Sequence, residues 1–319
     1  MPTSECVACT APMRSLQQAQ WLMGAREVPG WLECAGCGTV QVHPIPGTGQ
    51  LRRWYTTESL SEGTGTVGPP SSWKRWALRQ LVRAWPSSHP RDRAWRWLLD
   101  PLASHFQGLP STASAGASAG HILDVGCGDG LLLAILRDVG WTVDGIEMDP
   151  RRAAIARGHG IPVWVGDLHD YTADGPSFTT VRFWHVLEHL PDPRQALRLA
   201  RHRWLQPGGE LIVGVPNIQS AMHRIFGTRW AGLQIPKHLF HFTEPGIRRM
   251  VESAGFIHVR VAHRSCGTVL DSLPLIWGRP GGLIARLPPV RLTSIYVDRI
   301  LDRLEVGDAF EVRAVAPLL

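Results

Sequence analysis

The chain has 319 residues, of which 44% are hydrophobic and 19% are charged, and its formal net charge is +6. This composition excludes a disordered polyelectrolyte, and no apolar run approaches the length of about 18 residues that a membrane span needs. The first residues, Met1–Cys6, lack the basic start and apolar core of a signal peptide, so we expect a cytoplasmic protein. The basic balance favours anionic partners, which include nucleic acid, a membrane surface and a phosphorylated substrate.

Near the N-terminus, four of the six cysteines form two Cys-x-x-Cys pairs, Cys6 with Cys9 and Cys34 with Cys37. Two such pairs on opposite hairpins offer four thiolates to one zinc ion in tetrahedral geometry. The spacing therefore predicts a structural zinc ribbon over residues 1–57, with a redox pair as the alternative.

The next part, residues 58–120, is predicted to connect the ribbon to a larger domain. Residues 61–72 are rich in Gly, Ser, Thr and Pro, as in a linker, and residues 111–120 are a low-complexity tether. Between them, residues 73–102 combine Trp and Arg at helical spacing. These basic amphipathic helices either lie on an anionic bilayer, at the inner face of the membrane, or pack as a cap on the rest of the protein.

The most informative stretch is HILDVGCGDG, residues 121–130, followed by the helix-forming residues 131–139. An apolar strand that ends in a glycine loop before a helix is typical of a nucleotide-type site at the carboxyl end of a parallel strand. The glycines alternate and two carboxylates flank them: Gly126, Gly128 and Gly130, with Asp124 and Asp129. The dinucleotide spacing G-x-G-x-x-G is absent, and the carboxylates would repel a phosphate but attract an ammonium or sulfonium.

Two further acidic residues follow predicted strands. Glu147 ends the strand expected at 141–146, where a carboxylate can accept both hydroxyls of a ribose. Asp167 follows the strand expected at 161–165, where it can accept the exocyclic amine of adenine.

The pattern Asp-x-Gly-x-Gly-x-Gly, then Glu, then Gly-Asp at three successive strand ends resembles the class I S-adenosylmethionine-dependent methyltransferases. The similarity spans roughly residues 121–262 and includes Phe183–Pro193, Leu205–Gly209, Glu244–Ile247 and Ala254–Phe256. It implies an α/β fold over residues 121–319, a Rossmann-like, doubly wound sheet of about seven strands with the last strand antiparallel. It also implies that the methyl donor contacts Asp124, Gly126, Cys127, Gly128, Gly130, Glu147, Met148, Asp167, Leu168 and His185.

The predicted elements of this domain alternate along the chain. Strands are expected near 121–125, 141–146, 161–165, 179–184, 210–216, 256–262 and 309–315, and helices at 129–139, 150–158, 192–204 and 243–254. Two connections, residues 217–242 and 263–308, are longer than the fold needs, and long loops of this kind are usually functional.

A hydroxyl or carbon acid must lose a proton on methylation, which calls for a base or a metal ion. The residues His185, Glu188 and His189 follow the fourth strand of the domain. In ubiquinone-pathway O-methyltransferases a similar stretch, Glu-x-x-Glu-His, is implicated in binding a divalent cation. Here His185 replaces the first glutamate, which disfavours magnesium. His189 is the candidate base, and the alternative is that Glu188 and His189 bind the neighbouring loop.

A second group of candidates lies at residues 230–243. Similar stretches occur in small-molecule methyltransferases with an N-terminal cysteine ribbon. Lys237 and His238 are placed to meet a phosphate or polar head group, and His241 to relay a proton, unless these side chains only pack the loop. Arg224 and Arg229 would reinforce a pocket for an anionic substrate.

The leading hypothesis is therefore an enzyme that methylates oxygen, carbon or nitrogen of a small molecule, such as a sugar, a secondary metabolite or a lipid-linked precursor. The second hypothesis is an RNA methyltransferase whose ribbon and basic helices bind phosphates. Against it, the fourth strand lacks the Asn/Asp-Pro-Pro-Tyr/Phe signature of many enzymes that methylate base amines. The third is a non-catalytic binding protein with a vestigial cofactor pocket, which the intact Asp124, Glu147 and Asp167 disfavour.

Overall fold

The structure is a computed structural model that describes residues 5–15, 30–47, 51, 107–110, 120–173, 175, 177–235 and 237–318. The Trp-rich segment 73–102 and most of the tether at 111–120 lie outside the described residues, so the predictions for them remain predictions. No helix within the described ranges has both the length and the apolar character to cross a membrane.

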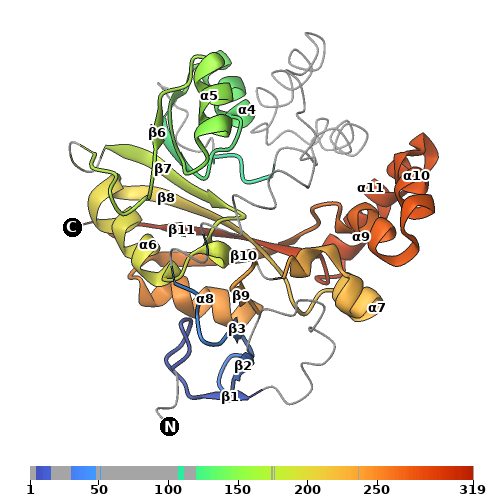
Figure 1. Ribbon diagram of the computed structural model, residues 1–319. Coiled ribbons are helices and arrows are strands. Elements are labelled where there is room, and N and C mark those ends of the chain that lie inside the picture. Colours follow the sequence, from blue (N-terminus) through green and yellow to red (C-terminus); the bar gives the residue numbers. More distant parts are fainter. Residues whose placement is uncertain are drawn as a thin grey trace.

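The large sheet contains the strands β4 (His121–Val125), β5 (Thr142–Glu147), β6 (Val163–Val165), β7 (Phe178–Trp184), β8 (Leu205–Pro216), β10 (Ile257–Arg264) and β11 (Ala309–Val315). Their order across the sheet is β10-β11-β8-β7-β4-β5-β6 (Figure 1). Neighbours from β8 to β6 are parallel, whereas β11 runs antiparallel to both β8 and β10. The predicted seven-stranded sheet with an antiparallel last strand is confirmed. β8 begins earlier than predicted because Leu205 already pairs with Phe178.

Four helices cover the two faces of this sheet. They are α4 (Leu131–Asp138), α5 (Pro150–Gly158), α6 (Pro193–Leu199), which continues in a π-helical turn (Ala200–Trp204), and α8 (Glu244–Ser253). Three of these helices start with a capping side chain, since Asp149, Asp192 and Thr243 each accept a backbone N–H of the first turn and a proline follows each cap.

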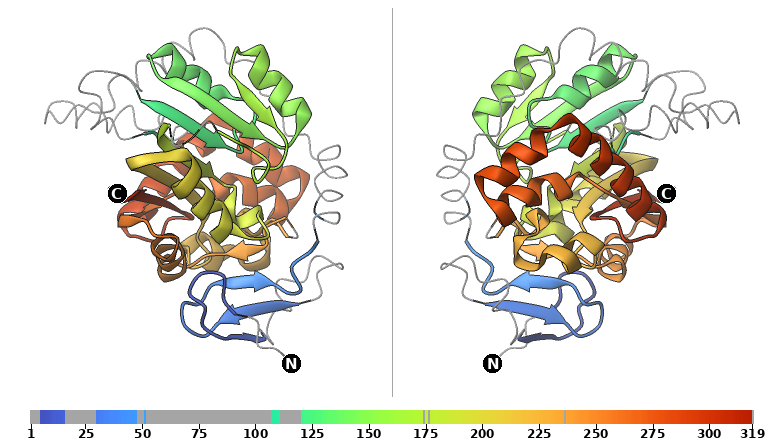
Figure 2. Two further views of the ribbon diagram at one scale, coloured as in Figure 1. Left: turned by 90° about the vertical axis from the view of Figure 1, so that its left-hand side faces the viewer. Right: turned by 90° about the vertical axis from the view of Figure 1, so that its right-hand side faces the viewer.

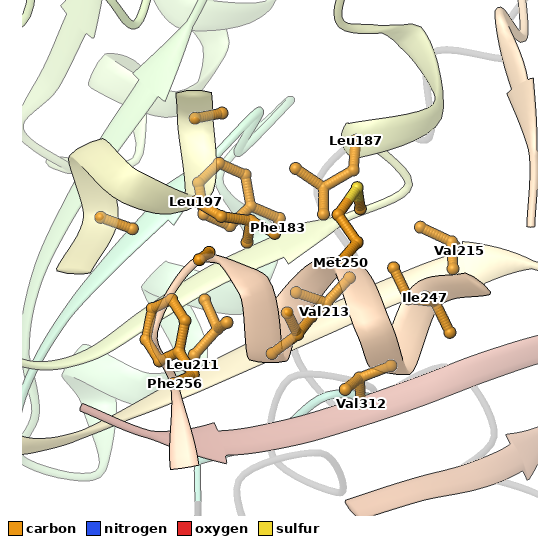
Figure 3. Close-up of a cluster of buried hydrophobic side chains, with 14 of the residues drawn as sticks. Phe183, Leu187, Leu197, Leu211, Val213, Val215, Ile247, Met250, Phe256 and Val312 are labelled. Atoms are coloured by element: carbon orange, nitrogen blue, oxygen red, sulfur yellow. The ribbon is translucent and has the colours of Figure 1, made fainter. Parts of the chain in front are cut away.

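Side chains alternate between the two faces along each strand. Ile122 packs with α4 and α5 in one apolar cluster, whereas Leu123 and Val125 belong to a second cluster with α6 and α8. Figure 3 shows this second cluster, in which Phe183 and Met250 lie within one apolar layer. Burial on both faces explains why these strands are almost continuously apolar in sequence.

The N-terminal cysteine region forms a smaller antiparallel sheet. Its strands are β1 (Met13–Ser15), β2 (Trp31–Cys34), β3 (Val40–Val42) and β9 (Phe240–His241), in the order β1-β2-β3-β9. The fourth strand, β9, comes from the long connection at residues 217–242, which sequence patterning did not predict. The small sheet lies against α8 and is coloured blue at its N-terminal strands in Figures 1 and 2.

Three side chains of the large domain bind backbone carbonyls of the cysteine region. Thr243 Oγ1 donates to Cys37 O at 2.6 Å, Arg249 Nη1 donates to Gly36 O at 3.0 Å, and Arg194 Nε donates to Val7 O at 3.0 Å. Helix α6, helix α8 and the N-cap residue of α8 thus hold the cysteine region, called the ribbon below, in one position on the large domain.

Both long connections contain helices that the sequence analysis did not predict. The first contains α7 (Ala221–Phe226) and two 3-10 turns, Gly227–Arg229 and Ala231–Leu233. The second contains α9 (Thr268–Trp277), α10 (Arg279–Arg286) and α11 (Pro288–Arg303), which project from the side of the sheet in Figure 1. The prolines at positions 274, 280, 288 and 289 and the glycines at 278, 281 and 282 obscured the helical periodicity of this stretch.

Thr243→Val should destabilise the protein because Thr243 both caps α8 and binds the ribbon. Its Oγ1 accepts from Gly246 N at 3.1 Å and donates to Cys37 O. Loss of the cap and of one buried hydrogen bond should lower the free energy of unfolding by about 1–2 kcal/mol in urea denaturation. Thr243→Ser keeps the hydroxyl and is the matched control. A Val variant as stable as wild type would show that this link contributes nothing.

Candidate active site

The glycine loop lies where β4 ends and α4 begins, and its backbone requires glycine at two positions in particular. Gly126 has φ +73°, and a Cβ there would lie 2.5 Å from Val186 Cγ2. Gly130 has φ +71°, and a Cβ there would lie 2.7 Å from Ala156 Cβ on α5. The first glycine allows close approach of the loop that follows β7, and the second allows α4 and α5 to pack together.

Glu147, at the end of β5, holds the glycine loop in place. Its Oε2 accepts from Gly128 N at 2.8 Å, and its Oε1 accepts from Asp149 N at 2.9 Å. Each carboxylate oxygen has a second lone pair, so the same side chain retains acceptor capacity for a ribose hydroxyl. Glu147 therefore connects the loop to the neighbouring strand end, as expected for the acidic residue of a nucleoside site.

Asp124 has a different environment from the one that the sequence alone suggested. It is almost fully buried, and its two oxygens lie 2.8 and 3.0 Å from Arg182 Nη1 on β7. Burial raises the pKa of Asp124, while the Arg182 guanidinium acts in the opposite direction. A cationic ligand would thus meet a carboxylate already paired with Arg182. The sequence signal for this pair was an arginine inside the apolar strand Phe178–Trp184, and it was missed.

The other predicted donor contacts differ in exposure. Met148 is 50% exposed beside Glu147, whereas Leu168 is buried. Asp167 Oδ1 accepts from His169 N at 3.0 Å and lies 2.7 Å from His169 Nδ1. Cys127 packs over Gly145, where a Cβ would lie 2.5 Å from its Sγ, and burial raises the pKa of its thiol. These properties are those of a packed, unreactive cysteine in the loop and not those of a nucleophile.

A second polar cluster begins directly after β7. His185, with φ +54°, has Nδ1 3.2 Å from Glu188 Oε1 and Nε2 3.3 Å from Cys266 Sγ. Glu188 is fully buried, and its Oε2 has no hydrogen-bond partner within the described part of the chain. A buried carboxylate oxygen without a partner is costly, so it marks a position at which a ligand atom or a cation would be favourable.

The loop at residues 230–243 brings His238 close to His189 of this cluster. His189 Nδ1 lies 3.0 Å from Lys237 O and His238 Nδ1 lies 2.9 Å from Gly232 O. A carbonyl oxygen only accepts, so Nδ1 carries the proton in both rings and Nε2 is the basic atom. The ring centroids are 4.6 Å apart.

Glu188, His189 and His238 each offer one ligand atom, and these atoms lie within 4.8 Å of one another. One carboxylate and two imidazoles suit zinc, iron or manganese better than magnesium, which prefers oxygen ligands. The set also suits proton removal from an acceptor, because an imidazole beside a carboxylate is a typical general base.

Burial favours the neutral form of His189, His238 and His241. Burial lowers the pKa of His189 and takes the pKa of His238 well below its usual value. Burial also lowers the pKa of His241 to about 3. His241 lies farther from Glu188, with its ring centroid 6.0 Å from that of His238 and 5.2 Å from Trp31 of the ribbon. Of the five predicted catalytic residues, Glu188, His189 and His238 gather together, His185 contacts Glu188, and His241 adjoins His238.

Two of the three charged residues expected to form an anionic-substrate pocket lie at the surface. Arg224 and Arg229 are exposed, and Lys237 is half-buried with its carbonyl bound to His189. Cys266 contacts His185 and thereby joins the connection at residues 263–308 to the cluster.

The four N-terminal cysteines are gathered at the ribbon. Cys6 Sγ lies 3.7 Å from Cys37 Sγ, Cys9 Sγ lies 3.3 Å from Cys34 Sγ, and the four sulfurs are within 4.8 Å of one another. Backbone N–H groups point at two of them, Ala8 N at Cys6 Sγ and Gly36 N at Cys34 Sγ, each at 3.3 Å. This donor set fits a tetrahedral thiolate site.

A family model described as "Methyltransferase domain" matches residues 89–261. Among curated relatives, a ubiquinone biosynthesis O-methyltransferase of Xanthomonas euvesicatoria is 34% identical over 133 residues, 39% of this chain and 55% of the relative. One from Pseudomonas paraeruginosa is 36% identical over 110 residues, 32% of this chain and 47% of the relative. The chain thus spans about half the length of the curated relatives it matches.

Solved structures resemble the chain more weakly. A Thermotoga maritima protein described as a SAM-dependent methyltransferase, possible histamine N-methyltransferase, is 19% identical, with a TM-score of 0.47 over 76% of this chain and 99% of that one. A Haemonchus contortus phosphoethanolamine N-methyltransferase 2 in complex with S-adenosyl-L-methionine is 17% identical, with a TM-score of 0.46 over 75% of this chain and 60% of that one.

His241→Phe should stabilise the protein and reduce its acid sensitivity. Neither ring nitrogen of His241 has a partner within the described residues, and a phenyl ring avoids that cost of about 1–3 kcal/mol. The folded pKa of about 3 lies below the ordinary 6.5, so this histidine contributes stability above pH 6.5 that is lost as the pH falls toward 3. Thermal unfolding of both proteins across this range should show a shallower decline for the Phe variant. A steeper or equal decline would contradict the assignment.

Proposed function

The chain belongs to the methyltransferase domain family, and on that premise we propose that it transfers a methyl group from S-adenosylmethionine to oxygen, carbon or nitrogen of a small molecule. The observation that carries the proposal is the pairing of two sites at one edge of the sheet. Glu147 and the glycine loop lie at the ends of β4 and β5, and the cluster around Glu188 and His189 follows β7, which neighbours β4. Ligands of open α/β sheets bind at this carboxyl edge.

The residues divide the work between binding and proton removal. The bound donor supplies an electrophilic methyl group and a thioether leaving group, so the protein has mainly to align the acceptor and exclude water. Glu147 and Asp167 would hold the adenosyl group, with Met148 beside it. His189, whose partial burial lowers its pKa, would accept the acceptor's proton at Nε2, and Glu188 would stabilise the resulting imidazolium.

The same cluster fits a divalent cation as an alternative to direct base catalysis. Glu188, His189 and His238 would hold it, and their composition favours a borderline metal over magnesium. A cation there would lower the pKa of an acceptor hydroxyl, and His185 would then orient Glu188 through the 3.2 Å contact between them.

We also propose that the cysteine cluster holds one structural zinc ion and that the chain is organised as a ribbon (1–57), a connector (58–120) and a catalytic domain (121–319). The four converging sulfurs and the N–H groups directed at them support the zinc assignment. The pairing of β3 with β9 supports a role for the ribbon in shaping the acceptor side of the site.

The proposed reaction is tested by incubating the protein and S-adenosylmethionine with fractionated lysate metabolites and, separately, with RNA. Mass spectrometry should detect the gain of one methylene in a small molecule and none in RNA. Methylated RNA would favour the RNA hypothesis instead. The absence of both products together with no donor binding in calorimetry would support a vestigial pocket.

Glu147→Gln and His189→Gln should separate the two parts of the site. The first removes the charge that accepts the ribose hydroxyls, so calorimetry should show donor affinity weakened about tenfold or more. The second should lower kcat by about 10²–10⁴ with donor affinity unchanged. Glu252→Gln and His202→Gln, at exposed positions, are the matched controls. If His189→Gln left kcat intact, His189 would not be the base.

Cys37→Ser should abolish zinc binding and destabilise the ribbon. Elemental analysis should find about one zinc per wild-type chain and none in the variant, while Cys127→Ser keeps the metal. The free energy of unfolding should fall by about 3 kcal/mol, the value for a ligand present at about a hundredfold its Kd. A metal-free wild-type protein with oxidised cysteine pairs would support the redox alternative.

A further inference from the structure

The helices α9, α10 and α11 form a lobe, which is called the α9–α11 lobe below. It spans residues 268–304, including the C-cap residue of α11, and lies beyond the matched family region. Figures 1 and 2 show it protruding from the side of the large sheet. More than half of the large apolar side chains that are exposed within the described residues belong to this lobe. Leu283 is 66% exposed and Trp277 is 56% exposed. A patch of this kind marks an interaction surface.

The exposed charge of the lobe surface is mostly positive. Its exposed charged side chains are one acidic residue, Asp271 on α9, and four arginines, Arg279, Arg286, Arg291 and Arg303. The two acidic residues of α11 do not share that surface. Asp298 is buried, and Asp302 is partly buried with its Oδ1 accepting from Ser265 Oγ at 2.7 Å.

Arginines and apolar side chains share the same helix faces. On α10, Arg279, Leu283 and Arg286 recur at intervals of four and three residues, and on α11 Leu292, Tyr296, Ile300 and Arg303 recur at intervals of four, four and three. Trp277 and Leu275 add exposed apolar surface at the end of α9. Arginines interspersed with Trp and Leu are typical of helices that lie in the interface of an anionic bilayer.

We propose that the α9–α11 lobe docks this protein on the surface of an anionic lipid bilayer. Its apolar side chains would enter the boundary between headgroups and acyl chains, and its arginines would bind lipid phosphates. Charge disfavours two other occupants. A second copy would bring arginines against arginines, and the segment 73–102 carries seven Lys and Arg against two Asp, so it is repelled as well.

The lobe is joined to the acceptor side of the candidate active site. Thr268 Oγ1 accepts from Trp230 Nε1 at 2.9 Å, and Ser272 Oγ accepts from Ala231 N at 3.0 Å. Cys266, just before α9, contacts His185. Docking therefore holds the loop that carries His238 close to the membrane. If the protein transfers methyl groups as proposed above, on which this inference rests, the placement favours an amphiphilic acceptor that resides in the bilayer.

Vesicle flotation of the full chain tests the docking. The protein should float with vesicles of phosphatidylcholine and phosphatidylglycerol, float poorly with phosphatidylcholine alone, and be released at high salt. Arg286→Ala and Arg291→Ala should each weaken partitioning about fivefold, and Leu283→Ser with Leu287→Ser should weaken it further. Arg198→Ala on α6 and Ile155→Ser on α5, both exposed, are the matched controls and should float as wild type.

The outcomes separate docking from the proposed reaction. The lobe variants should keep wild-type thermal stability and donor affinity in calorimetry, so a loss of flotation would be a loss of docking alone. Flotation that resists the lobe substitutions but disappears with Arg75→Ala, Arg79→Ala and Arg83→Ala would assign membrane contact to the segment 73–102 and overturn the proposal. No flotation, or a lobe-dependent dimer in light scattering, would also overturn it.

Discussion

The backbone of Leu239 connects the three parts of the molecule that meet at the candidate site. Its N–H donates to Glu188 O at 2.7 Å, and its carbonyl accepts from Val42 N at 2.9 Å. One buried peptide segment thus binds the loop after β7 on one side and the edge strand of the ribbon on the other. Two hydrogen bonds in opposite directions fix this segment, so the histidines on either side of Leu239 have defined positions.

The ribbon consequently acts as part of the domain. β9 has two residues, Phe240 and His241, which is too short to form a strand without a partner sheet, and β3 supplies that partner. The contacts of Arg194, Arg249 and Thr243 with ribbon carbonyls hold the same arrangement from the other side. The small sheet with its four gathered cysteines therefore supports the loop at residues 230–243, which carries His238.

The two halves of the site use buried charge in different ways. On the side proposed to hold the methyl donor, three carboxylates have hydrogen-bond partners: Asp124 binds Arg182, Glu147 binds two backbone N–H groups, and Asp167 binds His169. On the acceptor side Glu188 keeps an unpartnered buried oxygen and His241 keeps two unpartnered ring nitrogens, within the residues described. Unsatisfied buried polar atoms cost stability, so the free oxygen of Glu188 marks a position where a ligand atom would complete the network.

Local patterns in the sequence were sufficient for the large sheet, its order of elements, the glycine loop and the pairing of the cysteines. Strand alternation, helix caps and glycine spacing act over a few residues, and the parallel crossovers leave few topologies to choose from. Tertiary structure alone decided that Arg182 neutralises Asp124, that His238 joins Glu188 and His189, and that β9 completes the ribbon sheet. Each of these depends on register and packing between segments far apart in the chain, which no local pattern encodes. The helices α9–α11 were missed because glycine and proline masked their helical periodicity in the sequence. Contacts with the surrounding structure stabilise these helices in spite of their low helix propensity.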